Sequence, residues 1–135
     1  MIEALVFPET RSALFDLIDG STHDGESVRA AYQLQADSRG ALLGPFPVAL
    51  IYVTGGTQGY IDRVDRATIE VYAPGEQAVN VLESICASIV GDGIETPSGY
   101  IDQIEPDVTP AEVPYQSDTL NRATATVLVT SRPIN

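Results

Sequence analysis

Residues 48–89 read VALIYVTGGTQGYIDRVDRATIEVYAPGEQAVNVLESICASI and contain two strand patterns followed by one helix pattern. Residues 48–53 form an unbroken apolar run with β-branched and aromatic side chains, which predicts a buried strand at the centre of a sheet. The glycines of residues 55–59 then predict a reversal of the chain. In residues 67–72, apolar positions alternate with more polar ones, which predicts the returning strand.

The clearest helix pattern follows Pro74 and Gly75. An apolar stripe at helical spacing runs through this segment. The stripe consists of Ala78, Leu82, Ile85, Cys86 and Ile89. Gly91 and Gly93 predict that the helix ends there.

The segments before residue 48 predict four further pieces of structure. We expect a helix over residues 8–19, a loop over residues 21–27, a half-buried strand over residues 28–35 and a connecting loop over residues 37–47. The helix begins at a proline, which suits the first helical position.

After the second helix, the sequence predicts a short strand over residues 100–105 and a final strand over residues 123–130. Pro106, Pro110 and Pro114 predict an irregular loop between them, because proline cannot donate to a strand ladder. The predicted order is α-β-β-β-α-β-β. We therefore expect one α+β domain over residues 1–135, with two helices packed on a mainly antiparallel sheet.

The composition excludes several classes of function. The 135 residues carry a formal net charge of −12, and all seven basic residues are arginine. Without lysine there is no Walker-type phosphate lysine and no Schiff base, and the acidic field disfavours a nucleic-acid-binding surface. One cysteine and one histidine exclude an internal disulfide, a thiolate metal cage and a His-rich metal site. With no signal-peptide pattern and no apolar run of about 20 residues, we expect a soluble protein in the reducing cytoplasm.

The glycine-containing residues 55–59 have two interpretations. A phosphate-binding loop would lead from a strand into a helix N-terminus and would carry a lysine. Here the loop joins two predicted strands and has no lysine. We therefore favour a flexible hairpin tip, of the kind that often contacts other molecules.

Residues 62–66, DRVDR, form the densest charge cluster. Paired carboxylates could bind a hard cation or act in acid–base chemistry. In an extended segment, however, residues 62 and 65 point to opposite faces, and each aspartate has an arginine nearby. We favour a salt-bridge strip that is exposed or lies between subunits. The candidate subunit-interface or ring-interface residues are Gly55, Gly56, Thr57, Gln58, Gly59, Asp62, Arg63, Asp65 and Arg66.

The remaining reactive side chains do not indicate catalysis. Cys86 lies on the apolar stripe, where a free cysteine packs as a small hydrophobe. His23 lies in an acidic loop and is expected to be exposed. The sequence has no Gly-x-Ser-x-Gly motif and no serine with an evident base. We expect no enzymatic activity, no cofactor and no bound metal.

Four segments carry a resemblance to a known family. They are residues 55–66 (GGTQGYIDRVDR), residues 70–76 (EVYAPGE), residues 94–102 (IETPSGYID) and residues 117–134, which begin SDTLN and end TSRPI. These segments resemble small tail-completion proteins of phages with long, non-contractile tails, and the resemblance covers most of the chain. Within that group the sequence is most similar to the tail terminator, also called the tail-to-head joining protein.

The resemblance implies a virion protein at the head–tail junction, assembled in the host cytoplasm. A homohexameric ring would sit on the last ring of tail-tube protein, stop tube growth and present a surface to a head-completion or connector protein. DNA would only pass through the lumen, and no membrane would be involved. The predicted α-β-β-β-α-β-β order is compatible with this fold.

Two alternatives remain open. Head–tail connectors and other minor tail proteins share the same structural module. In a different class, an acidic regulatory module could mimic DNA or bind a basic protein, as the net charge would favour. The acidic residues, however, are spread from Glu3 to Asp118 and do not form a tract.

Overall fold

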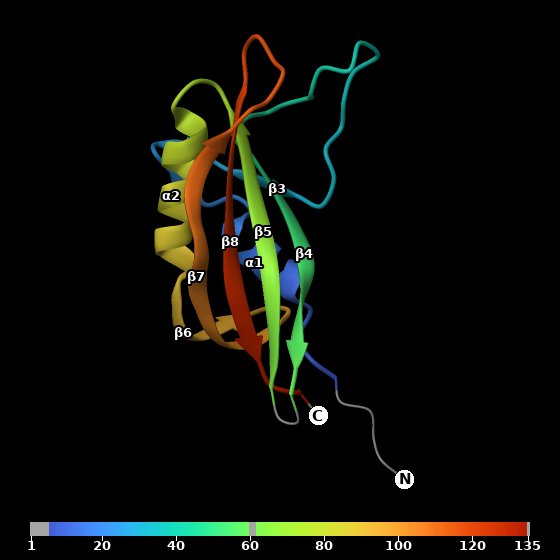
Figure 1. Ribbon diagram of the computed structural model, residues 1–135, viewed down its shortest axis with the longest axis vertical. Helices are drawn as coiled ribbons and strands as arrows, with labels where there is room; N and C mark the ends of the chain where they lie inside the picture. Colours follow the sequence, from blue (N-terminus) through green and yellow to red (C-terminus); the bar gives the residue numbers. More distant parts are fainter. Residues whose placement is uncertain (1–5, 60–61, 135) are drawn as a thin grey trace.

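The computed structural model describes residues 6–59 and 62–134 (Figure 1). A six-stranded sheet in the order β3-β4-β5-β8-β7-β6 has both helices on one face, and β1 and β2 form a separate hairpin. All pairs are antiparallel except β3–β4. The elements are α1 (Thr10–Ile18), β1 (Thr22–His23), β2 (Glu26–Ser27), β3 (Arg29–Ala31), β4 (Val48–Gln58), β5 (Arg63–Ala73), α2 (Gln77–Ile89), β6 (Gly91–Thr96), β7 (Gly99–Val113) and β8 (Asn121–Ser131).

The main core lies between the helices and one face of the sheet. In β5 and β8, every second residue between 67 and 73 and between 123 and 129 is apolar and buried. Leu14 of α1 and Leu82 of α2 pack onto this face and are fully buried. The apolar residues at every second position of the strands and those at helical spacing on α1 and α2 therefore form one apolar layer.

The predicted fold class is confirmed. Two helices pack on a mainly antiparallel sheet, and the predicted order corresponds to α1, β3, β4, β5, α2, β7 and β8. The structure adds the β1–β2 hairpin, where we expected only a loop, and β6. The strand β6 begins at Gly91, which the sequence pattern indicated only as the end of the helix.

Before residue 48, the predicted elements are longer than the observed ones. Helix α1 occupies Thr10–Ile18 within the predicted range of residues 8–19. The strand expected over residues 28–35 is reduced to β3, which pairs in parallel with Val48–Leu50. The chain then leaves the sheet, and Leu34 packs with Leu42 and Phe46 in a second, smaller apolar cluster.

The prediction that residues 55–59 reverse the chain was wrong for residues 55–58. These residues belong to β4, which stays paired with β5 as far as Gln58 opposite Arg63. A register shift between Val53 and Gly55 allows the ladder to continue. The Gly59 N–H donates to the Asp62 carbonyl oxygen at 2.8 Å, and residues 60 and 61 are outside the described residues. The centre of the sheet is β5 and β8, and not β4 as predicted.

The irregular loop predicted after residue 105 is wrong for residues 106–113 and correct from Pro114 to residue 120, where the chain is irregular. Strand β7 continues through Pro106 and Pro110 to Val113. Prolines are tolerated because β6 pairs with β7 only as far as Ile104, so the later part of β7 has a described strand neighbour, β8, on one side only. The ladder between β7 and β8 has two register irregularities, between Pro106 and Val108 and between Val108 and Ala111. They lie where the prolines have no N–H to donate to β8.

Candidate subunit-contact site

Residues 55–58 and 63–66 form the far end of the β4–β5 ladder, called the arm below. Gly55 lies at the register shift with a φ of +112°, a backbone conformation that favours glycine. At Gly56, a Cβ atom would overlap the carbonyl oxygen of Val64 on the opposite strand. The close pairing of the two strands therefore accounts for both glycines without a bound phosphate.

The arm has an open backbone edge. Strand β3 pairs with β4 only at Val48–Leu50, and no other described strand pairs with β4 on that side. Residues 54–58 are all exposed. Because the glycines have no side chains, hollows of about 180 Å³ and about 330 Å³ lie beside them. Free N–H and C=O groups on an edge strand are a common site of contact with another chain.

Asp65 is buried and connects the arm to helix α1. The Thr10 hydroxyl donates to Oδ2 of Asp65 at 2.6 Å, and Nε of Arg63 donates to Oδ1 at 2.9 Å. Asp62, in contrast, is exposed, so the two carboxylates do not share a site. Within residues 6–59 and 62–134, no three His, Cys, Asp or Glu side chains are grouped so that they could hold a metal ion.

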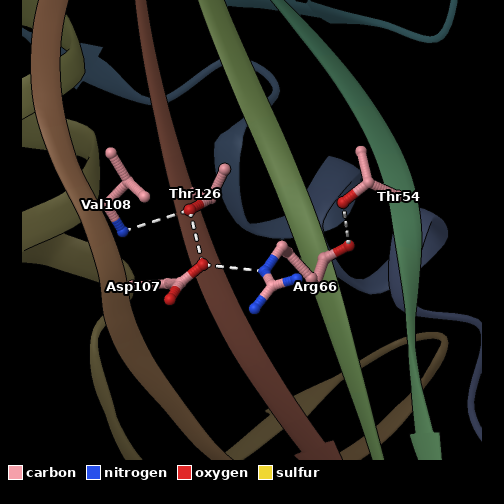
Figure 2. A network of polar contacts seen from close by, with 5 residues as sticks. All are labelled: Thr54, Arg66, Asp107, Val108 and Thr126. Carbon is pink, nitrogen blue, oxygen red and sulfur yellow. Dashed lines mark hydrogen bonds and ion pairs between the residues drawn. The ribbon is translucent and has the colours of Figure 1, made fainter.

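Arg66 takes part in a polar network on the face of the sheet that carries no helix. Figure 2 shows Arg66 on β5 reaching across β8, with its Nε donating to Oδ2 of Asp107 on β7 at 2.8 Å. The Thr126 hydroxyl of β8 donates to the same oxygen at 2.8 Å and accepts from the Val108 N–H at 3.1 Å. The Thr126 hydroxyl and then Arg66 lower the pKa of Asp107. On the other side, Thr54 donates to the Arg66 carbonyl oxygen.

The structure thus brings together only part of the predicted strip. Arg63 and Asp65 pair with each other, whereas Arg66 pairs with a residue 41 positions later in the chain. Sequence reasoning missed Thr10, Asp107 and Thr126, because only the register of β5, β8 and β7 and the packing of α1 bring them to the arm.

His23 is buried, which corrects the expectation that it is exposed. Its Nε2 lies 2.8 Å from the Ser21 hydroxyl and its Nδ1 lies 2.8 Å from the Ser84 hydroxyl on α2. Ser21 donates its proton to the Ile18 carbonyl, so it accepts from Nε2, and Nδ1 accepts from Ser84. The statement that no serine has an evident base is therefore wrong. The neutral ring links the β1–β2 hairpin to α2, and burial lowers the pKa of His23 from 6.5.

This lowered pKa predicts that the protein loses stability in mild acid. The folded chain resists protonation of His23, whereas the unfolded chain takes up the proton near its ordinary pKa of about 6.5. The contribution of His23 is complete above that pH and is lost as the pH falls from 6.5 towards the lowered pKa. Urea midpoints measured between about pH 7.5 and about pH 5.5 should fall more steeply for the parent chain than for His23→Gln. Equal slopes would contradict the assignment.

Cys86 lines an apolar pocket and is not activated. Burial, and then the charge of Glu83, raise the pKa of the Cys86 thiol to about 11, so it stays protonated at neutral pH. The pocket has a volume of about 260 Å³ and lies between α2 and the later part of β7. Its lining contains no carboxylate, histidine or arginine that could act as an acid or a base.

The sequence matches no protein-family model, and no curated protein matches it significantly. In the part of the chain that the structure describes, no helix is long and apolar enough to cross a membrane.

Proposed function

We propose that this chain is a structural virion protein of a phage with a long, non-contractile tail. Six copies form a ring that caps the tail tube, ends its polymerisation and offers a joining surface for the head-completion or connector protein. One observation carries the proposal. Residues 55–66, one of the four segments that resemble tail terminators, contribute to an exposed arm with an open strand edge, which suits contact with other chains.

The distribution of charge supports this role at the head–tail junction. Five arginines already form ion pairs with carboxylates of the same chain. They are Arg11, Arg63, Arg66, Arg122 and Arg132. Most of the acidic excess is therefore left without a cation, and a ring of six copies multiplies it. Such a ring would repel the phosphates of DNA and let the duplex slide through, whereas an arginine-lined opening would hold it.

Deleting the gene for this chain from its phage tests the proposal. Electron microscopy of the lysate should show tail tubes of uncontrolled length or tails not joined to heads, and the wild-type chain supplied in trans should restore normal virions. Normal tails joined to heads in the deletion strain would refute the proposed function. Tails of normal length that only fail to join heads would favour the connector role over that of a terminator.

A further inference from the structure

The apolar pocket beside α2 is suited to receive a side chain from another molecule. It opens where β7 has no β6 neighbour, and Val90 and Val108 in its wall are 37% and 56% exposed. Ala87 and Pro106 also contribute apolar surface. An open apolar concavity of this kind is typical of a site into which a partner inserts an anchoring residue.

A carboxylate lies beside this pocket. Glu83 stands one turn before Ala87 on α2 and is exposed, and within the described residues the structure shows no arginine partner for it. The chemistry of the rim therefore favours an apolar or aromatic anchor that arrives together with a positive charge.

An exposed aromatic residue beside an arginine lies near the opposite edge of the sheet, next to β3. Tyr32 follows β3 and is 43% exposed. Its ring packs on Phe15 of α1 with 5.1 Å between centroids, and the Arg11 guanidinium lies 5.2 Å from the ring centroid. These contacts hold an aromatic ring and a cation together at the surface, where Arg11 also pairs with the exposed Glu9 of its own chain at 3.1 Å. Tyrosine and arginine are the residue types most often found as anchors of protein interfaces.

The anchor and the pocket lie at opposite sides of the molecule. In the sheet order, β3 is the first strand and β7 is the fifth, and Figure 1 shows α2 and β7 on one side and β3 and β4 on the other. One neighbour therefore cannot engage both sites in a two-fold dimer. Contacts between two different patches repeat head to tail, and they close into a ring when the rotation between copies allows it.

We propose that Tyr32 and Arg11 of one copy occupy the pocket between α2 and β7 of the next copy, with Arg11 facing Glu83 of that copy. This inference rests on the ring proposed above, because it supplies the lateral contact between neighbouring subunits. The aromatic ring covers Val90 and Val108, which are otherwise exposed, and the arginine removes part of the repulsion between the acidic copies. This contact does not involve the arm, whose open edge is available to a neighbouring subunit, the tail tube or the head-side partner.

Photo-crosslinking tests the contact while keeping an aromatic side chain in place. In Tyr32→p-benzoylphenylalanine, illumination of the concentrated full-length chain in high salt should give a ladder of covalent species that ends at six. Peptide mapping should place the crosslinks on residues of α2 and β7. Tyr100→p-benzoylphenylalanine is a matched control, because Tyr100 is 45% exposed but lies outside both patches, and it should give no crosslink to this pocket.

Charge exchange provides a second test that does not depend on an unnatural residue. Arg11→Glu alone and Glu83→Arg alone should each raise the protein concentration needed for assembly by about tenfold or more, and the combined variant should restore it. Both residues are exposed, so the variants should remain folded. Arg39→Glu, on the loop between β3 and β4, is the control and should leave assembly unchanged.

The outcomes separate this inference from the proposed function. A hexamer by native mass spectrometry that gives no crosslink to the pocket would overturn the contact and leave the ring intact. A pocket crosslink in species that do not stop at six would support the contact and contradict the hexamer. A chain that stays monomeric without crosslinks overturns the contact, while the gene deletion decides the function independently.

Discussion

Replacing Leu82 with alanine is expected to lower the free energy of unfolding by about 2–5 kcal/mol. Leu82 is fully buried on α2 and packs into the main core against the sheet. Leucine and alanine are both good helix formers, so the loss comes from packing and the cavity left behind, and not from the helix itself. For a domain whose stability is about 5–15 kcal/mol, this is a large fraction.

Urea unfolding at a fixed protein concentration measures the effect, because assembly would otherwise add to the apparent stability. Asn80→Ala on the same helix is the matched control, because Asn80 lies outside the pocket proposed for subunit contact. Its side chain is exposed, and it should change the free energy of unfolding by no more than about 0.5 kcal/mol. A similar loss in both variants would mean that α2 does not pack on the sheet through Leu82.

The elements that sequence predicted well are those with strong local periodicity. The alternation in β5 and β8 appears as predicted, and α2 buries the predicted stripe except that Cys86 is only half-buried and Val81 is buried in addition. A buried face imposes a helical or a two-residue repeat on the sequence. The fold class follows from these three elements together with α1. Their buried apolar side chains belong to the same core.

The errors arise where a contact distant in sequence decides the local structure. Residues 55–58 have the composition of a turn, but pairing with β5 keeps them in the ladder. Pro106 and Pro110 indicate a loop, but β8 holds them in β7. His23 lies among acidic and polar residues, and only the position of Ser84, 61 residues later, explains its burial.

The sequence predicted which residues form the candidate site, but it did not predict which residues they contact. The sequence drew attention to the charges of residues 62–66, yet it offered no means of distinguishing an ion pair within the chain from one between chains. In the structure, Arg63 and Arg66 both have intrachain partners, Asp65 and Asp107. Whether the exposed parts of the arm also meet another subunit stays a prediction.

Asp65→Ala is expected to destabilise the protein by about 1.5–3 kcal/mol, the usual worth of a hydrogen bond to a charged group. Asp65 is 5% exposed, and its loss would leave the Thr10 hydroxyl without its acceptor. Arg63 is less affected, because its side chain is 43% exposed and water can replace the carboxylate. Urea unfolding of the variant gives the loss directly.

Asp62→Ala removes the neighbouring carboxylate of the same cluster and should change stability by no more than about 0.5 kcal/mol, because Asp62 is exposed. In a double-mutant cycle, Thr10→Ala and Asp65→Ala should show a coupling energy of about 0.5–3 kcal/mol, since the two side chains share one hydrogen bond. Additive losses would refute this link between α1 and the arm. If the link holds, a loss of ring formation in Asp65→Ala reflects a displaced arm, whereas the same loss in the stable Asp62→Ala would place the carboxylate of Asp62 in the contact itself.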